Sequence, residues 1–511
     1  MLSSLVIVGR SQRVKKNLLL LVVMSSLFMC FSIGFAAPVE KEIVIEHGGT
    51  EKVEEFAIIN EFERLIPASV IKEHLYSNAM INVDSKQLEV QFPLVRFNLE
   101  ENLIPKKFYK NNFLMIPCKN IDDILYIDVD IAAKVFGFSV KEDEKVLCIK
   151  ANRYNAFNPQ YLKKHEKVAT GGKILMAWQP TFEESVDVTK TEKVMGLNVI
   201  SPSWFAIVGE DGLIKNKTDY RYVKAAHAKG YRVWPLITNS FDPALTHKIL
   251  IDEQARENVI KQLVIYARLY DFDGINLDFE NIYDEDKELL SSFVKEIADA
   301  LKLVNLKSSI DVTAPSDASQ WSTCYDRKAL AEAVDYVMLM AYDEHWRTSP
   351  VSGSVASIGW VEKGIVNTLK DVPKEKLVLG VPFYMREWQE NLVGEKNVKA
   401  KTLTMSQAEK MIEDKGIVPL WLDEIGQYYF QYEDESKVYK VWQEEAKSLK
   451  LKVDLVDKYQ LAGMAAWRKG FEKPEVWEVI HKTLGSADEC IQDNDKKLHK
   501  EKKKKRKKQS Q

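Results

Sequence analysis

The sequence predicts an α/β protein, a (β/α)8 barrel preceded by a small α+β module. Strand and helix patterns alternate over roughly 310 residues, from about residue 170 to residue 485. Eight apolar strand candidates occur in this stretch, which is the number that closes a parallel barrel. The alternative is a doubly wound open sheet, but no glycine-rich phosphate loop follows the first strand.

The eight predicted barrel strands are short and apolar. They are residues 173–178, 196–205, 231–237, 272–280, 308–315, 334–342, 376–384 and 461–467. Amphipathic helices are predicted between most of them, for example at 252–270 and 284–304, because apolar side chains recur there at helical spacing. The connection from Arg386 to about Asp457 is too long for one βα unit. We therefore expect an α+β insertion between the seventh and eighth strands.

Residues 52–150 predict the small α+β module. Runs such as 145–150 have the composition of strands, and a helix is expected over 129–135, stopped by Gly137. The segment has no paired histidines, no CxxC motif and no clustered nucleophile, which favours a structural or binding role. It resembles the module at the N-terminus of copper amine oxidases and of exported bacterial proteins. That module binds no copper by itself, so we expect no metal here.

The two ends of the chain differ in composition from its body. Residues 1–36 contain four basic and no acidic residues, an apolar run and a small-residue exit, as in a secretory signal peptide. An uncleaved membrane anchor is the alternative. Residues 486–511 form a basic tail, with ten Lys or Arg and one Glu from residue 496 onward. The tail is interpreted as a solvated end or as a tether to anionic wall polymers. It lacks the interleaved aromatics of a nucleic-acid arm, so no nucleic-acid partner is expected.

Cysteine usage is sparse. Beyond the predicted signal peptide the chain of 511 residues contains Cys118, Cys148, Cys324 and Cys490. So few cysteines in an exported chain of this size indicate folds that do not depend on disulfides. Cys118 and Cys148 lie in the same predicted module, where they either pair or remain thiols.

The fourth predicted strand carries unusual polar residues inside an apolar run. Because side chains alternate along a strand, Asn276, Asp278 and Glu280 share one face. In a barrel this face is the interior one, and it rises toward the C-terminal mouth where barrel active sites lie. Burial of carboxyl groups raises the pKa, which suits an acid that protonates a glycosidic oxygen. An acidic loop and a hard-cation site are the alternatives, but no histidine is near.

Residues 273–280, DGINLDFE, resemble the DGxDxDxE signature of glycoside hydrolase family 18, the chitinase family. Three further segments match that family in the same order: 340–343 (MAYD), 380–384 (GVPFY) and Trp467. One departure stands out, because Asn276 replaces the first Asp of the family's DxDxE. That substitution, together with segments 201–205, 324–346 and 461–477, is similar to the bacterial branch that contains spore cortex-fragment lytic enzymes and other exported cell-wall N-acetylglucosaminidases. The resemblance favours peptidoglycan over chitin.

The resemblance implies substrate-assisted retention, in which the substrate's 2-acetamido oxygen is the nucleophile. Glu280 is then the acid and base, Asp278 holds the acetamido N–H, and Tyr342 donates to the acetamido oxygen. Asp343 binds sugar or the acidic network, and Trp467 forms the floor under the sugar ring. The remaining predicted substrate-binding residues are Asn276, Met340, Trp178 and Tyr384, and we also expect Gln179, Trp204, His345 and Trp346 near the mouth.

These observations predict an exported monomeric glycosidase without cofactor or metal. Its expected partner is an N-acetylated glycan polymer, and its expected location is the cell wall or spore envelope. The alternatives left open are a chitinase, an enzyme that trims N-glycans, and a non-catalytic lectin on the same barrel. The last is favoured by the missing carboxylate at residue 276 and opposed by the presence of Asp278 and Glu280.

Overall fold

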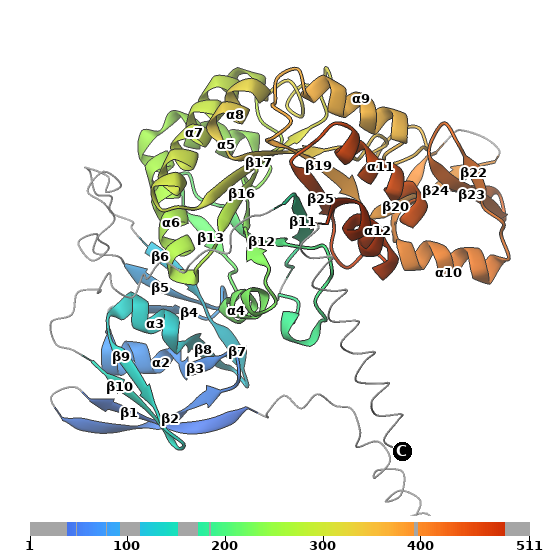
Figure 1. The fold of residues 1–511 in the computed structure, drawn as a ribbon. Helices are drawn as coiled ribbons and strands as arrows, with labels where there is room; N and C mark the ends of the chain where they lie inside the picture. The colour runs from blue at the N-terminus through green and yellow to red at the C-terminus, as the bar shows by residue number, and fades with distance from the viewer. Residues whose placement is uncertain are drawn as a thin grey trace, which may run out of the picture.

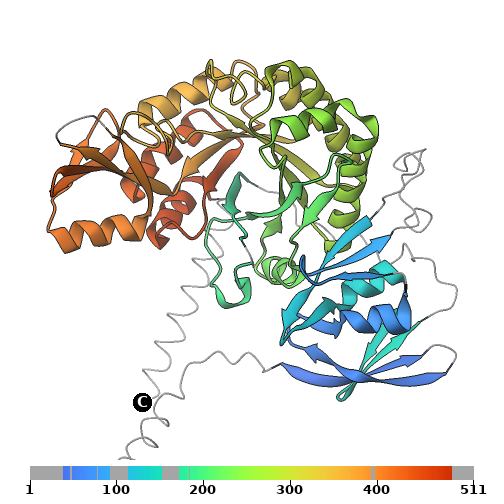
Figure 2. The same ribbon diagram turned by 180° about the vertical axis from the view of Figure 1, so that it is seen from behind.

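The computed structural model describes residues 38–46, 49–77, 79–91, 113–151, 172–182, 185–392 and 397–485. The predicted signal peptide and the basic tail lie outside these residues. Within them, a small N-terminal module packs against a barrel, and the barrel carries an inserted subdomain on its other side (Figure 1 and, from behind, Figure 2). Every helix in the described part of the chain is too short or too polar to cross a bilayer.

Eight parallel strands close into a barrel, which confirms the predicted fold. Their order is β11-β25-β19-β18-β17-β16-β15-β12, and β12 pairs with β11 to complete the ring. The strands are β11 Ile174–Gln179, β12 Val199–Ile207, β15 Leu236–Thr238, β16 Gly274–Asp278, β17 Lys307–Thr313, β18 Tyr336–Met340, β19 Leu377–Pro382 and β25 Gly463–Trp467. The predicted third strand is split into β14 Arg232–Val233 and β15, because Pro235 has no N–H to donate to a ladder.

Helices follow the barrel strands and pack outside them. They are α4 Tyr220–Ala228, α5 Pro243–Ile251, α6 Glu253–Tyr270, α7 Lys287–Leu303, α8 Arg327–Ala333, α9 Ile358–Thr368, α11 Ala446–Lys458 and α12 Pro474–Leu484, with the 3-10 turns η5 Val188–Lys190 and η6 Asp284–Asp286. The helices predicted at 252–270 and 284–304 are confirmed as α6 and as η6 with α7. Asp252 caps α6 by accepting two backbone N–H bonds, and the helix ends where Asp271 adopts a left-handed φ of 64°.

The insertion predicted between the seventh and eighth strands is present. It is an antiparallel sheet in the order β21-β20-β24-β23-β22 with one helix, and Figure 1 shows it at one edge of the barrel. Its elements are β20 Tyr384–Asn391, β21 Lys399–Thr404, α10 Met405–Lys415, β22 Leu420–Leu422, β23 Gln427–Asp434 and β24 Lys437–Gln443. β20 starts two residues after β19 ends, so the insertion is joined directly to the barrel mouth.

The N-terminal module contains two sheets. A seven-stranded sheet has the order β7-β8-β3-β2-β1-β10-β9, and a three-stranded sheet contains β4, β5 and β6. The elements are β1 Val39–Glu46, β2 Thr50–Ile59, β3 Arg64–Pro67, α2 Ala68–Val70, η1 Ile71–Leu75, β4 Met80–Asn82, β5 Gln87–Gln91, β6 Phe113–Pro117, β7 Lys119–Ile121, β8 Ile124–Asp128, α3 Val129–Phe136, β9 Ser139–Glu142 and β10 Val146–Lys150. The predicted start at residue 52 is too late, because β1 lies between β2 and β10. The predicted helix is α3, stopped by Gly137 at a φ of 75°.

Buried hydrogen bonds join this module to the barrel. Asn216, fully buried on β13 Ile214–Asn216, donates to the carbonyl of Met115 at 2.9 Å and accepts at its own carbonyl from Gln87 at 2.7 Å. The hydroxyl of Tyr266 on α6 accepts the backbone N–H of Met115 at 3.0 Å. The Gln87–Asn216 bond is fully buried, and together these bonds fix the module to the barrel wall.

Cys118 and Cys148 are free thiols in the structure, and so is the buried Cys324. Of the two states left open by the sequence, the structure therefore contains the unpaired one.

Candidate active site

The barrel interior changes from apolar to polar toward the mouth. The lower part is filled by side chains such as Ile174, Met176, Trp234, Met338 and Val378. Asn276 and Asp278, 0% and 6% exposed, lie above this layer at the C-terminal half of β16. Glu280 follows two residues later, half-buried at the mouth. The period of two along the strand thus brings the predicted polar face into the interior.

Asn276 is held by four side chains from three other strands. Its Oδ1 accepts from Trp178 Nε1 at 2.8 Å and from the Ser201 hydroxyl at 3.4 Å. Its Nδ2 donates to Ser309 Oγ at 3.0 Å and to Asp311 Oδ1 at 2.6 Å. An indole N–H can only donate, so Trp178 fixes which end of the amide faces β11 and which faces β17.

Asp311 was not among the residues predicted from the sequence. It lies on β17, is 1% exposed and points into the barrel beside Asn276. The available signal was the same one that marked β16, a carboxylate inside an apolar strand pattern, in SSIDVT at 308–313.

The three interior carboxyl groups influence one another. Burial raises the pKa of Asp278 well above its usual range, and the charges of Glu280 and Asp311 act in the same direction. Burial likewise raises the pKa of Glu280 to about 7, helped by the charge of Asp343 and opposed by a hydrogen bond from Asp278. Burial also raises the pKa of Asp311. Like charges taken out of water cannot all ionise, so protons are retained near neutral pH.

Aromatic side chains surround the carboxyl groups. Trp178 lies edge-on to Tyr342 with ring centroids 6.5 Å apart and is tilted against Trp467 at 6.2 Å. Gly380 on β19 makes room for this indole, because a Cβ there would lie 3.3 Å from the Trp178 ring and 2.7 Å from a backbone carbonyl oxygen. Tyr342 lies edge-on to Tyr384 at 6.3 Å. Tyr342 and Trp467 remain partly exposed, so apolar ring surface is available at the mouth.

Asp343 is held at the mouth by the inserted subdomain. Its Oδ1 accepts from the Tyr384 hydroxyl at 2.5 Å and from Arg386 Nη2 at 2.6 Å, both on β20. Arg386 is 5% exposed and was not among the site residues predicted from the sequence. Met340, predicted to bind substrate, is 7% exposed at the end of β18.

Several predicted mouth residues lie elsewhere. Trp204 is 1% exposed and packs between Tyr222 and Phe272, outside the strand ring, so the expectation for it was wrong. Gln179 is buried and accepts from the Tyr222 hydroxyl at 2.7 Å. On β12 both faces are covered, so an apolar residue gives no sign of which face it occupies.

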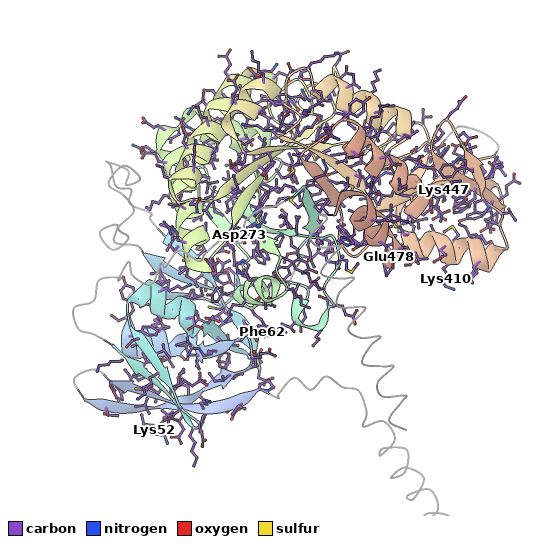
Figure 3. The ribbon with its side chains drawn as sticks, in the orientation of Figure 1. Lys52, Phe62, Asp273, Lys410, Lys447 and Glu478 are labelled. Atoms are coloured by element: carbon purple, nitrogen blue, oxygen red, sulfur yellow. The ribbon has the colours of Figure 1, made fainter. Side chains whose placement is uncertain are left out.

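Three other residues of the sequence motifs lie outside the carboxyl cluster. Asp273, labelled in Figure 3, precedes β16, and its carboxylate lies 2.9 Å from His227 Nε2. It is therefore at the opposite end of the strand from Glu280. His345 binds the Ser354 carbonyl through Nδ1 at 2.8 Å, which is a packing role. Trp346 is 51% exposed beyond it.

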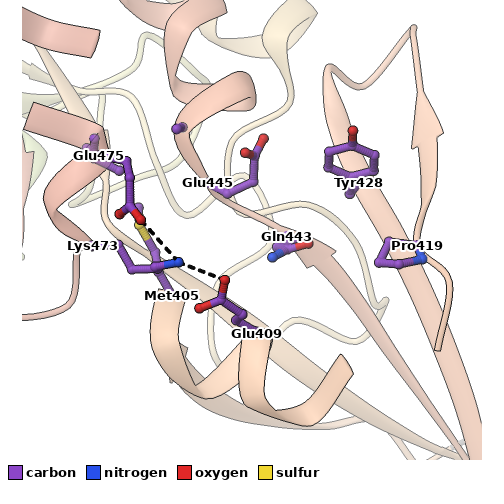
Figure 4. A pocket seen from close by; sticks show the side chains of 10 residues that line it. Met405, Glu409, Pro419, Tyr428, Gln443, Glu445, Lys473 and Glu475 are labelled. Carbon is purple, nitrogen blue, oxygen red and sulfur yellow. Dashed lines mark hydrogen bonds and ion pairs between the residues drawn. The ribbon is translucent and has the colours of Figure 1, made fainter. Parts of the chain in front are cut away.

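A separate open cavity of about 460 Å³ lies between α10, β24 and the start of α12. Figure 4 shows Lys473 bridging Glu409 and Glu475 at its edge. None of the residues around Glu280 lines it, and its one lysine is already paired. We therefore assign the candidate site to the barrel mouth, because the buried carboxyl groups lie there and not in this cavity.

Among the described residues, no group of three or more His, Cys, Asp or Glu side chains could hold a metal ion.

The arrangement can perform acid catalysis on a bound sugar. A carboxyl group with a pKa of about 7 is about half protonated at neutral pH, so a large fraction of the molecules can donate a proton to a leaving oxygen. A second buried carboxyl lies beside it, and partly exposed aromatic rings offer flat apolar surfaces for a pyranose face.

Comparison with known proteins agrees with this geometry. The family model for glycosyl hydrolases family 18 matches residues 184–471. An uncharacterised glycosylase, YvbX, of Bacillus subtilis is 27% identical over 299 residues, covering 56% of this chain and 84% of its own. The cortical fragment-lytic enzyme of the same organism is 29% identical over 254 residues, covering 48% of this chain and 58% of its own length.

The crystal structure of the spore cortex-lytic enzyme SleL of Bacillus cereus superposes with a TM-score of 0.56 at 22% identity. This superposition covers 62% of this chain and 76% of that one, and it supports the fold. The family match spans more than half of the chain and includes the strand ends that carry Asp278, Glu280 and Tyr342. The chain therefore belongs to glycosyl hydrolases family 18.

Proposed function

We propose that this chain hydrolyses β-1,4 bonds next to N-acetylglucosamine in peptidoglycan, with retention and with the substrate's acetamido group as nucleophile. The observation that carries the proposal is the pKa of Glu280, raised to about 7 beside a second buried carboxyl at an aromatic barrel mouth. Such a group can give a proton to the leaving oxygen and then take one from water.

The other site residues have supporting roles in this proposal. Asp278 holds the acetamido N–H and stabilises the positive charge of the oxazolinium intermediate. It is suited to this because its Oδ1 has no hydrogen-bond partner in the described structure. The Tyr342 hydroxyl donates to the acetamido oxygen, and Trp467 supports the sugar ring. Asp343, positioned by Tyr384 and Arg386, binds substrate and raises the pKa of the acid.

Peptidoglycan is proposed over chitin because the proteins similar to this chain include ones named cortical fragment-lytic enzymes. Both sugars of peptidoglycan carry the N-acetyl group that this chemistry needs. Chitin cleavage, N-glycan cleavage and binding without cleavage are the competing outcomes of the test below.

The test is product analysis by mass spectrometry on peptidoglycan fragments, chitin oligomers and N-glycans. Wild type is expected to release products ending in N-acetylglucosamine from peptidoglycan fragments. Glu280→Gln should lose activity on the order of 10³-fold while still binding substrate. Glu285→Gln is the matched control, because this glutamate is exposed in η6. Near wild-type activity of Glu280→Gln would refute its role as the acid.

We also propose export through residues 1–36 and retention at the wall through the basic tail. The ten Lys and Arg side chains within residues 496–511 would attract anionic wall polymers, and salt weakens such electrostatic attraction. Deletion from Lys496 onward should weaken wall binding at low salt and leave high-salt binding unchanged. Equal retention of both proteins at every salt concentration would rule out the tether.

A further inference from the structure

A third buried carboxyl group, besides Asp278 and Glu280, lies on β17, the strand paired with β16. Asp311 is 1% exposed, and its closest polar contact is Asn276 Nδ2 at 2.6 Å. The DGxDxDxE signature of family 18 has an Asp at the position of Asn276 in this chain. A carboxylate is nevertheless present in the same interior layer, on the neighbouring strand.

We propose that Asp311 is a positioning residue that replaces the carboxylate missing at residue 276. It acts through Asn276 and through its own charge, and it sets how protons are shared between Asp278 and Glu280. The proposal rests on the proposed function, since it concerns the same site.

The geometry of the Asn276 amide supports this. Trp178 and Ser201 both donate to Oδ1, while Nδ2 is used by Ser309 and Asp311. With all four directions occupied, the amide cannot turn toward Asp278 without breaking a buried bond. Asp278 therefore has Glu280 as its side-chain hydrogen-bond partner. Its Oδ1 atom has no partner in the described structure, which agrees with an amide that faces away from it.

The charged surroundings of Asp311 are almost all acidic. The carboxyl groups of Asp278 and Glu280 on β16 and the phenol of Tyr342 after β18 are the titratable groups whose charges interact with Asp311. Asp343, whose charge acts on Glu280, is paired with Arg386. No cation contacts Asp311 among the hydrogen bonds and ion pairs of the described residues, so removing its carboxyl removes repulsion from the cluster.

This predicts the direction of a pH shift. In a cluster of interacting acids the last proton leaves at the highest pH, and each acid removed lowers that pH. Asp311→Asn keeps the size of the side chain and an oxygen for Asn276 Nδ2 but cannot titrate. The alkaline limb of kcat/KM should therefore move down by about one pH unit, since one pKa unit is a modest interaction energy for buried charges.

Moving the carboxylate back to residue 276 provides the rescue. Asn276→Asp alone adds an acid, so its alkaline limb should move up. The double variant Asn276→Asp with Asp311→Asn restores the number of carboxyls, and its limb should return close to that of wild type. The matched control is Asp335→Asn, at the other end of the barrel beside the start of β17, where Asp335 pairs with Lys307. This control should leave the profile unmoved.

The proposal is overturned if Asp311→Asn and wild type give superposable pH profiles, or if the double variant keeps the shift of the single one. A merely structural role would lower the melting temperature without moving the limb. If Asp311→Asn does not fold, the double variant compared with Asn276→Asp measures the same loss and should lie about one pH unit lower.

A second readout separates this proposal from the proposed function. NMR titration of ¹³C-carboxyl aspartate should show an interior aspartate in wild type whose pKa lies well above the usual range of aspartate, and this pKa should be lower in Asp311→Asn. If wild type cleaves none of the glycans but the NMR shift appears, the proposed function fails and the role of Asp311 stands. If wild type cleaves glycans but the aspartate signals of Asp311→Asn match those of wild type, the proposed function stands and the role of Asp311 fails.

Discussion

A fully buried ion pair fastens the inserted subdomain to the barrel. Lys452 on α11 and Glu444 after β24 are both 0% exposed, with Nζ 3.0 and 2.9 Å from the two carboxylate oxygens. Glu444 also accepts from Ser448 at 2.6 Å and from Gln427 at 2.9 Å. Gln427 in turn accepts from Ser354 in the loop after β18 at 2.5 Å. The network therefore joins the insertion to the loop behind Asp343.

Lys452→Met tests this network. It leaves Glu444 buried without its cation, which costs about 3–5 kcal/mol of unfolding free energy at neutral pH. Burial already raises the pKa of Glu444, and Lys452 opposes that shift most strongly, so the variant raises the pKa further. A folded-state pKa above the unfolded one means that stability falls as pH rises between the two values. The variant should lose up to about 1.4 kcal/mol per pH unit in that window.

The assay is urea unfolding of both proteins at pH 5 and pH 8. The deficit of Lys452→Met should be several-fold smaller at pH 5, where the carboxyl takes up a proton. The double variant Glu444→Gln with Lys452→Met has no buried charge, so it should recover much of the loss and show no such pH dependence. A deficit of Lys452→Met that is the same at both pH values would refute the electrostatic reasoning.

Four further predictions concern the site and the module. The kcat/KM of wild type should fall above about pH 7, because the acid Glu280 must be protonated and its pKa is raised to about 7. Asp343→Asn should move this fall to lower pH, since the charge of Asp343 raises that pKa; an unmoved profile would contradict the coupling. Trp178→Phe removes the N–H donor of Asn276 and should lower the unfolding free energy by about 1–3 kcal/mol, measured by urea unfolding; no loss would mean that the bond contributes nothing. Tyr266→Phe leaves a buried N–H of β6 unpaired and should lower the melting temperature of the barrel and module together, whereas separate transitions would show that they unfold independently.

The sequence by itself determined the fold class and the central strand. Eight apolar runs alternating with helices leave few architectures, because parallel strands need crossover connections. Along β16 the period of two is a local property, so Asn276, Asp278 and Glu280 could be placed on one interior face without coordinates. The motifs ending β18 and β25 were recognisable for the same reason, because they are contiguous in the chain.

Only the tertiary structure decided which strands meet. Asp311 is 35 residues from Asn276, and their contact depends on the register between β16 and β17. β1 completes a sheet by pairing with β10, about 100 residues away, which no local pattern at residues 39–46 reveals. Trp204 was misplaced because a strand buried on both faces is apolar on both. Periodicity is encoded along the chain, whereas pairing and register are set by packing between distant segments, and these determine the partners of each buried polar group.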